Sequence, residues 1–247
     1  MAVAQLRPNE RYALVGKTRS GKTALAMVLA GTFARALPDP WEVWWLDTKN
    51  DPKDISALRK WGFRNVMSDS DRKTMGALLN AVYYKIDTND KDRHDVDTVE
   101  QVQAICAEAY ARTHTIVVID EYVQATPSSR IAGKALLDVF QRGGGNNVGL
   151  IGLTQEPVFV PRQLISQATH VVLLSLTYKY DVQYARNLCP EYVSPNRMGN
   201  QYGFYWSWVD GNAEWTYYED QLQWYDKLQV VLPRPPTPQE LPTQTGA

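Results

Sequence analysis

Residues 16 to 23, Gly-Lys-Thr-Arg-Ser-Gly-Lys-Thr, have the glycines, lysine and hydroxyl groups, and the spacing, that suit binding to a chain of phosphates. They match the pattern G-x-x-x-x-G-K-[ST] and lie between an apolar run, Tyr12 to Val15, and a stretch of helical periodicity. The glycines allow the backbone to curl until its N–H groups point at an anion, and the dipole of the following helix adds positive potential there. A chance glycine-rich turn would not explain this strand and helix, so the segment predicts a site for a nucleoside triphosphate.

Each side chain of this loop has an expected role. Lys22 would neutralise the β- and γ-phosphates, and the hydroxyl group of Thr23 would coordinate Mg²⁺. The rest of the loop would surround the phosphates with backbone N–H groups, and it consists of Gly16, Lys17, Thr18, Arg19, Ser20 and Gly21. The expected ligands are therefore ATP and Mg²⁺.

Two adjacent carboxylates, Asp120 and Glu121, follow the β-branched run Ile116 to Ile119. Asp120 would hold Mg²⁺ through a water molecule, and Glu121 would polarise a water molecule that attacks the γ-phosphate. Alternatively, the pair caps the next element. A water-polarising glutamate indicates hydrolysis rather than transfer to a substrate hydroxyl, for which no lid or acceptor pocket is recognisable in the sequence. The 98 positions from Lys22 to Asp120 suit ATPases in which another strand lies between the loop strand and the acid strand.

Gln155 and Arg142 are further candidates on either side of the apolar run 148–154. Gln155 ends this run, where its amide would contact both the γ-phosphate and the attacking water; a surface glutamine is the alternative. Arg142 precedes the glycine-rich segment 143–147 and would face outward, toward the nucleotide of a neighbouring subunit, where a guanidinium stabilises transition-state charge. A surface arginine is the alternative there, and three other arginines compete for the role: Arg130, Arg162 and Arg186.

Another polar pair, Asp47 and Lys49, ends the apolar run Trp41 to Leu46. Lys49 would lie near the phosphates or on the DNA backbone, and a solvated turn is the alternative. Polar positions thus end four apolar strands, at Gly16, Asp47, Asp120 and Gln155. Because the carboxyl ends of parallel strands share one edge of a sheet, and ligands bind at that edge, these positions are expected to converge on one site.

The alternation of apolar strands and amphipathic helices predicts an α/β fold with a mostly parallel sheet flanked by helices. Strands are expected at 11–16, 41–46, 63–67, 115–119, 148–153 and 169–176, and helices at 22–37, 53–61, 70–87, 96–112, 130–141 and 179–188. A proline-containing loop and a short helix are expected within 157–167. Residues 202–209 and 213–218 flank Asp210-Gly211-Asn212 and predict a C-terminal β-hairpin.

Length and composition, 247 residues with 44% hydrophobic and 21% charged residues, are typical of an ordinary globular protein. We expect a single ATPase domain over residues 1–231, with a polar lead at 1–10, and a flexible proline-rich tail over 232–247. Cys106 and Cys189 are too few for a disulfide framework and lack metal-ligand spacing, which favours a reducing cytoplasm. No apolar run approaches 18 residues, so no transmembrane segment is expected.

These motifs, in this order, resemble the FtsK–HerA superfamily of DNA-pumping ATPases. The matching segments span roughly residues 10–220 and are GKTRSGKT, the LDTK strand exit, TIVVIDE, the helix ending in Arg142, NNVGLIGLTQEP and RQLISQATHVVLLSLTYKYDVQYARNL. The phosphate loop and acid pair occur in many ATPases, whereas the TQxP ending after an arginine and glycine-rich turn is more discriminating. The small size, without an added membrane or DNA-reading domain, is most similar to the genome-packaging ATPases of internal-membrane, double-jelly-roll (tectivirus-like) viruses.

The resemblance implies a RecA-like (ASCE) P-loop NTPase core and a homo-oligomeric ring, commonly a hexamer, that translocates double-stranded DNA. It also implies action in the host cytoplasm or at the packaging vertex of the virion, with capsid-vertex or membrane packaging proteins as further partners. The site residues carried over are Lys22 and Thr23 for phosphate and Mg²⁺, Asp120 and Glu121 as metal ligand and base, Gln155 as sensor and Arg142 as a finger acting in trans. The family arginine lies slightly closer to its sensor glutamine, since two extra residues occupy the glycine run here.

A net charge of -1 excludes a protein that coats nucleic acid with a surface that is basic throughout. In a ring, however, one or two lysines per subunit would together form a circle of positive charge around the axis. Candidates for such contacts are Lys49, Lys53, Arg72, Lys73, Lys91, Arg93 and the segment 143–147. The leading hypothesis is an ATP-driven motor that packages a viral genome into a preformed capsid. Two alternatives stay open: a HerA-like or conjugative-type cellular or plasmid DNA pump, and an ATP-binding virion-assembly protein that does not move DNA.

Overall fold

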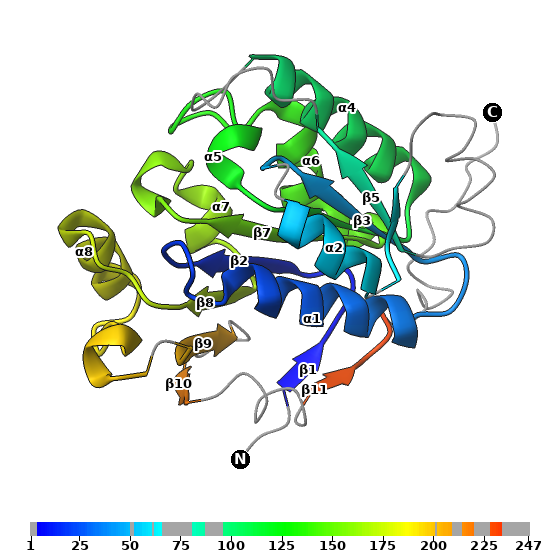
Figure 1. Cartoon of the computed structure of the whole chain (residues 1–247). Coiled ribbons are helices and arrows are strands. Elements are labelled where there is room, and N and C mark those ends of the chain that lie inside the picture. Colours follow the sequence, from blue (N-terminus) through cyan, green and yellow to red (C-terminus); the bar gives the residue numbers. More distant parts are fainter. Residues whose placement is uncertain are drawn as a thin grey trace, which may run out of the picture.

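The computed structural model describes residues 4–49, 52–60, 62–65, 81–86, 96–200, 202–208, 214–219 and 228–233. Within these residues, nine strands form one sheet in the order β10-β9-β8-β2-β7-β6-β3-β5-β4, and β1 pairs with β11 beside it (Figure 1). The strands are β1 (Ala4–Leu6), β2 (Arg11–Val15), β3 (Glu42–Asp47), β4 (Arg64–Asn65), β5 (Ala81–Lys85), β6 (Thr115–Ile119), β7 (Val148–Thr154), β8 (His170–Leu173), β9 (Phe204–Trp208), β10 (Glu214–Tyr218) and β11 (Leu228–Val230). The helices are α1 (Lys22–Ala36), α2 (Pro52–Lys60), α4 (Val96–Arg112), α5 (Tyr122–Ala125), α6 (Lys134–Arg142), α7 (Gln163–Ser166) and α8 (Lys179–Leu188), with 3₁₀ turns η1 (Gly143–Asn146), η2 (Pro157–Phe159) and η3 (Pro195–Met198).

The strands from β8 to β4 in this order are all parallel, which confirms the predicted α/β class. Strand β7 lies between the loop strand β2 and the acid strand β6, as the spacing from Lys22 to Asp120 indicated. Val15, the last residue of β2, pairs with Thr154, the last residue of β7. The parallel arrangement therefore brings the carboxyl ends of β2, β7, β6 and β3 to one edge of the sheet.

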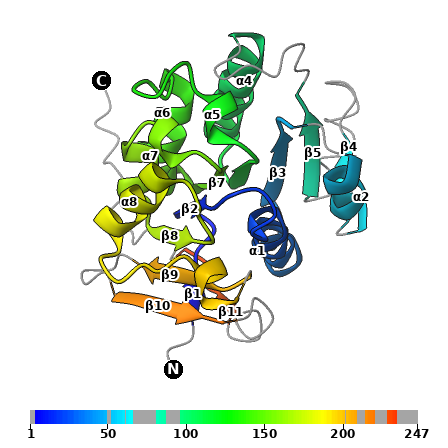
Figure 2. The same cartoon turned by 60° about the vertical axis from the view of Figure 1, so that its left-hand side comes forward.

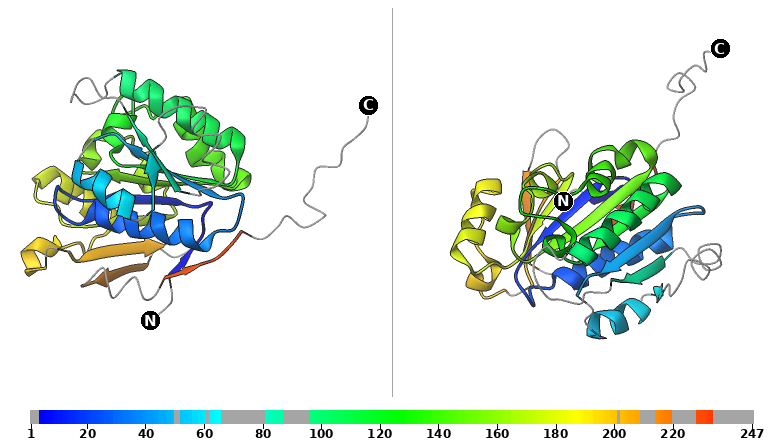
Figure 3. Two further views of the ribbon diagram at one scale, coloured as in Figure 1. Left: turned by 45° about the vertical axis from the view of Figure 1, so that its right-hand side comes forward. Right: turned by 90° about the horizontal axis from the view of Figure 1, so that it is seen from above.

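Helices cover both faces of the sheet, which explains why the central strands are apolar along their whole length. Side chains of α1 and α2 pack on one face, against residues such as Tyr12 and Trp45. Residues of α4, α5, α6, α7 and α8 pack on the other face (Figures 2 and 3). Every residue of β3, β6 and β7 is buried as a result.

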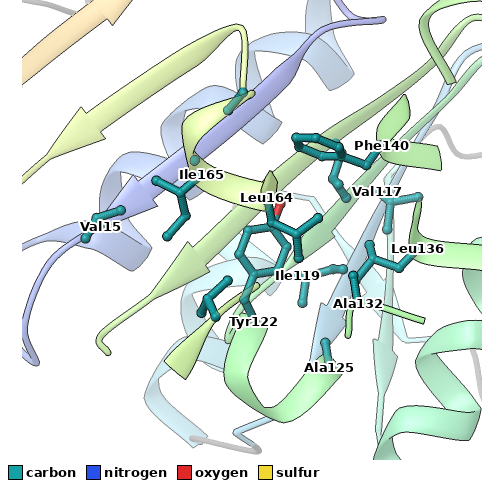
Figure 4. Close-up of a cluster of buried hydrophobic side chains, with 14 of the residues drawn as sticks. Val15, Val117, Ile119, Tyr122, Ala125, Ala132, Leu136, Phe140, Leu164 and Ile165 are labelled. Carbon is teal, nitrogen blue, oxygen red and sulfur yellow. The ribbon is translucent and has the colours of Figure 1, made fainter. Parts of the chain in front are cut away.

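Tyr122 is the centre of the cluster that holds the acid strand against the helices of the second face (Figure 4). It follows Glu121 directly and is 1% exposed. Its ring lies over Gly152 of β7, where a Cβ atom added to the glycine would be 1.7 Å from the ring carbon Cζ. The missing side chain at Gly152 therefore makes room for the residue that anchors the acid pair.

The predicted C-terminal hairpin is confirmed, since β9 and β10 pair antiparallel and β9 also pairs antiparallel with β8. The turn predicted at Asp210-Gly211-Asn212 lies outside the described residues. The hairpin thus extends the parallel sheet at its β8 edge and buries Phe204 and Trp206 against the α1 face.

The helix predicted over 70–87 is wrong at its C-terminal end, because Ala81–Lys85 is strand β5, paired parallel with β3. Val82 and Tyr83 have helical spacing with residues upstream, but they belong to a short apolar run that is buried on both faces. A doubly covered strand has no polar alternation, so periodicity does not separate it from a buried helix segment. Residues 70–80, the rest of that prediction, lie outside the described part of the chain.

Residues 1–10, predicted as a polar lead, contain strand β1, which pairs parallel with β11 near the C-terminus. Leu6 is fully buried and joins the α1 side of the core. The predicted boundary at residue 231 follows directly after β11, while residues 234–247 of the proline-rich segment lie outside the described residues. Among the described residues, no helix has the length and apolar character needed to span a bilayer.

Candidate nucleotide-binding site

The predicted phosphate loop connects the end of β2 to the start of α1, at the carboxyl edge of the sheet. Its start is held by the strands on both sides of β2, since the N–H of Gly16 donates to Thr154 and the N–H of Lys17 to Ser175. Arg19 (φ 62°) and Gly21 (φ 89°) have left-handed backbone conformations and Ser20 between them does not. Alternation of this kind turns successive N–H groups toward one point, which makes an anion-binding concavity.

Close packing within the loop requires a glycine at position 16. A Cβ atom added to Gly16 would lie 2.6 Å from Oγ of Ser20 and 2.8 Å from Cβ of Leu174. The hydroxyl oxygen of Ser20 is fully buried and has no hydrogen-bond partner among the described residues. The loop therefore curls tightly and retains an unsatisfied polar group, as a cradle for an anion would.

Lys22 is the first residue of α1, and only 4% of it is exposed. Burial, and then the nearby ammonium group of Lys49, lower its pKa to about 8, against the opposing effect of the Glu121 and Asp120 carboxylates. Burial makes the charged form of the lysine unfavourable, and an anion beside the ammonium group would stabilise that form. Its environment fits the predicted phosphate contact.

Asp120 and Thr23 lie together at the point where β6 ends and α1 begins. The hydroxyl group of Thr23 is 3.5 Å from Oδ1 of Asp120, and the Asp120 side chain is fully buried. The second carboxylate oxygen, Oδ2, has no hydrogen-bond partner among the described residues. A buried carboxylate with an unused oxygen, next to a hydroxyl group, fits the predicted pair of Mg²⁺ ligands.

Glu121 and Gln155 are connected across the ends of β6 and β7. The carboxylate of Glu121 accepts from the backbone N–H of Gln155 at 3.2 Å (Oε2) and 3.4 Å (Oε1). Burial raises the pKa of Glu121 above its ordinary value, although Lys49 and Lys22 act in the opposite direction. The side chain of Gln155 in turn accepts a hydrogen bond from the hydroxyl group of Thr18 in the phosphate loop. The structure thus connects the loop, Gln155 and Glu121 in one chain of contacts.

Solved structures with a similar fold include a viral packaging enzyme. The genome packaging NTPase B204 from Sulfolobus turreted icosahedral virus 2, in complex with sulfate, matches with a TM-score of 0.61 and 18% identity, over 86% of this chain and 96% of that chain. The same protein in complex with ATP-gammaS matches with a TM-score of 0.59 and 18% identity, over 85% and 98%. The fold is that of a RecA-like P-loop ATPase.

The DNA-packaging ATPase B204 from Sulfolobus turreted icosahedral virus also matches, with a TM-score of 0.59 and 19% identity over 86% of this chain and 98% of that chain. No protein-family model matches the sequence, and no curated protein is similar to it in sequence. The resemblance to genome-packaging ATPases predicted from the sequence is therefore confirmed at the level of the fold.

Asp47 and Lys49 bring a second cation into the site. The N–H of Lys49 donates to Oδ1 of Asp47 at 3.2 Å, and this short turn directs the lysine back across the end of β6. There its ammonium nitrogen lies 3.0 Å from Oδ1 and 2.9 Å from the carbonyl oxygen of Asp120. Of the positions considered for Lys49, the structure shows the one beside the predicted phosphate loop, where its ammonium group contacts Asp120. The sequence carried no signal for the contact with Asp120.

Arg142 lies far from these residues. Helix α6 ends at Arg142, just before the start of β7, so this arginine is at the amino edge of the sheet, whereas the loop is at the carboxyl edge. At roughly 3.3 Å per residue, β7 separates the two edges by about 20 Å. The Arg142 side chain is 72% exposed, with Nη1 3.8 Å from Oδ1 of Asp138. It takes no part in the site of its own chain, and its predicted role in trans stays a prediction.

None of the described contacts of the other candidate arginines involves the phosphate loop, and Arg162 is exposed just before α7. Arg130 is exposed on the segment before α6, and Nε of Arg186 donates to the carbonyl oxygen of Tyr192 at 3.3 Å. Lys53 is exposed on α2. Four of the predicted DNA-contact candidates fall outside the described residues: Arg72, Lys73, Lys91 and Arg93.

Proposed function

We propose that this protein binds ATP with Mg²⁺ and hydrolyses it. The observation that carries the proposal is the convergence of Lys22, Glu121 and Gln155 on the loop, each from the carboxyl end of a different strand or the helix after it. These residues are far apart in the sequence, and each is buried or held by a hydrogen bond. An arrangement with one buried cation, a base and a polar sensor around an anion cradle fits triphosphate hydrolysis.

Each residue of the proposed nucleotide site has a distinct role. Backbone N–H groups of the loop and the ammonium group of Lys22 bind and orient the phosphates. Thr23 and Asp120 would hold Mg²⁺, which when bound neutralises charge on the phosphate oxygens. Glu121 holds the attacking water and accepts its proton, and the hydrogen bond from the N–H of Gln155 keeps that carboxylate in place. The hydroxyl group of Thr18 holds the amide of Gln155 by a hydrogen bond, and this amide would contact the γ-phosphate.

We further propose that hydrolysis drives translocation of double-stranded DNA through a homo-oligomeric ring, expected to be a hexamer, during packaging of a viral genome into a preformed capsid. The fold shared with B204, a genome packaging NTPase, supports this function, as do the sequence motifs. The exposed position of Arg142, remote from its own nucleotide site, is compatible with action on a neighbouring subunit. The expected places of action are the host cytoplasm and the packaging vertex of the virion.

The test measures the ATPase rate with and without double-stranded DNA, over a series of protein concentrations for which the oligomer mass is determined in parallel. We expect ATP hydrolysis in the assembled form, stimulated by double-stranded DNA and weakened by added salt, because the DNA contacts are to the backbone. The Lys22→Ala variant is the inactive control.

The other outcomes separate the alternatives. A rate that is the same with and without DNA in every assembly state contradicts the motor and favours an ATP-binding assembly protein. Absence of hydrolysis under all these conditions contradicts the ATPase proposal itself. A double-jelly-roll capsid gene beside the gene for this chain favours packaging over a cellular or plasmid DNA pump.

A further inference from the structure

A pocket of about 480 Å³ lies next to the phosphate loop. Thr18 of the loop and Gln155 at the end of β7 border it, and their side chains are joined by a hydrogen bond. Two acidic residues, Glu156 and Asp181, border it as well. The pocket therefore brings a pair of carboxyl groups to the side of the proposed nucleotide site.

Asp181 contributes a buried carboxylate to the wall of this pocket. It lies in the first turn of α8 and is only 6% exposed. Its Oδ1 atom has no hydrogen-bond partner among the described residues. A carboxylate removed from water costs free energy unless a cation or a hydrogen-bond donor compensates its charge. Asp181 thus has the capacity to accept a further ligand.

Glu156 adds a second negative charge near Asp181. Burial, and then the Glu156 carboxylate, raise the pKa of Asp181 to about 6. Lys17 borders the same pocket, but no ion pair between described residues joins it to Asp181. Two carboxylates that oppose each other's ionisation in this way are stabilised together when a cation lies between them.

The residues that border the pocket indicate the kind of cation. No histidine or cysteine is among the described ones, so the pocket lacks the ligands typical of zinc sites. Mg²⁺ prefers oxygen ligands and usually keeps several water molecules, so one or two carboxylates are enough to hold it. In the described part of the chain, no group of three or more His, Cys, Asp or Glu side chains could hold a metal ion, which agrees with an ion that keeps most of its waters.

We propose that Glu156 and Asp181 hold a hydrated divalent cation such as Mg²⁺ in this pocket. The site is separate from the Mg²⁺ site predicted at Thr23 and Asp120, since neither of these residues borders the pocket. It goes beyond the proposed function, because binding there needs no nucleotide. Glu156 follows directly after Gln155, so an ion held by Glu156 would also restrain the segment that carries the proposed sensor.

The first test counts the divalent ions that bind the full chain without nucleotide. Mn²⁺ is the probe, because it prefers the same oxygen ligands as Mg²⁺ and its free form is measured by electron paramagnetic resonance. We expect Asp181→Asn to weaken binding at the pocket by about tenfold or more, and Glu156→Gln to weaken it as well. Asp120→Asn should leave binding at the pocket in place. The matched control is Asp97→Asn, since Asp97 is also an acidic residue in the first turn of a helix but is exposed on α4.

The second test compares melting temperatures with and without Mg²⁺. Saturating Mg²⁺ should raise the melting temperature of the wild type more than that of Asp181→Asn. Without the metal, Asp181→Asn should melt no lower than the wild type, because an uncompensated buried charge has been removed.

Three results would overturn the proposal. One is equal Mn²⁺ affinity of Asp181→Asn and the wild type, and another is an Asp120→Asn variant that binds no Mn²⁺ at all. If Asp181→Asn does not fold, Glu156→Gln decides the question, and normal Mn²⁺ binding by that variant is the third such result. None of these measurements uses ATP, so absence of ATPase activity would contradict the proposed function and leave the cation site standing.

Discussion

The ammonium group of Lys49 lies 3.0 Å from Oδ1 of Asp120, on the carboxylate expected to hold Mg²⁺. Burial lowers the pKa of Lys49, but Asp120 and Glu121 outweigh this effect and raise it above the ordinary value, so the lysine is charged at neutral pH. Thr23 contacts the same carboxylate oxygen at 3.5 Å. Lys49 and a metal ion would both be cations beside one carboxylate, so Lys49 is expected to oppose the binding of Mg²⁺ at Asp120.

Lys49→Met tests this expectation. Removing the ammonium group leaves the Asp120 charge without its ion pair, so we expect the free energy of unfolding without nucleotide to fall by about 1 to 3 kcal/mol. Addition of Mg²⁺ should then raise the melting temperature of the variant more than that of the wild type. Lys53→Met, an exposed change on α2, is the control for loss of a lysine. Equal responses of variant and wild type to Mg²⁺ would contradict the expected opposition.

Glu121→Gln should separate binding from hydrolysis. The amide has nearly the same shape as the carboxylate but does not accept the proton of the attacking water, so the turnover rate should fall by about two to four orders of magnitude. Nucleotide affinity, measured with a fluorescent analogue, should change little. Hydrolysis by Glu121→Gln at the wild-type rate would remove this residue as the base. Because burial raises the pKa of Glu121, the wild-type rate should decline on acidification at a higher pH than an ordinary carboxyl group would give.

The charge of Lys22 should make nucleotide binding depend on pH. With a pKa of about 8, this lysine is an ammonium group below that pH and becomes neutral above it, while phosphates bind the ammonium form. Affinity should therefore be nearly constant below pH 7 and fall about tenfold per pH unit above pH 8. Calorimetry at pH 8.5 in two buffers of different ionisation enthalpy should show proton uptake on binding.

The lowered pKa of Lys22 also makes the free energy of unfolding depend on pH. The unfolded chain, with an ordinary lysine pKa of 10.5, binds more protons than the folded chain between about pH 8 and that value. The contribution of Lys22 to the free energy of unfolding therefore rises with pH across this window. Lys22→Ala is the control, because without this lysine neither the proton uptake on binding nor the rise of the free energy of unfolding with pH should be seen. This variant should also lose nucleotide binding. Binding without proton uptake at pH 8.5 would contradict the depressed pKa.

Gly152→Ala should damage the site through packing. The added methyl group would overlap the ring of Tyr122, 1.7 Å from Cζ, and force the residue after Glu121 to move. We expect a loss of about 1 to 3 kcal/mol in the free energy of unfolding, measured by chemical denaturation, with a parallel loss of ATPase activity. At Gly145, nothing lies within 4 Å of an added Cβ atom, so Gly145→Ala is the matched control. Similar stability of the two variants would show that Tyr122 has room to move aside.

The positions of the phosphate-loop motif and of the acid pair at the ends of strands were predictable because their signals are local. Gly16, Lys22 and Thr23 lie within eight consecutive positions, and Asp120 and Glu121 end an uninterrupted β-branched run. Parallel pairing of β2, β7 and β6 is the structural counterpart of alternating strands and helices. The same kind of reasoning failed at residues 81–85, since a buried strand and a buried helix segment both consist of consecutive apolar residues.

The sequence by itself determined which residue types are available for phosphate, metal and water chemistry, and that strands would end beside them. Only the tertiary structure decided that Lys49 pairs with Asp120, that Tyr122 occupies the space over Gly152, and that β1 pairs with β11. It also placed Arg142 at the amino edge of the sheet, opposite the edge that holds the phosphate loop. The physical reason is that charge pairing and steric fit depend on distances between residues remote in the chain, and these distances arise only when the sheet and its helices pack.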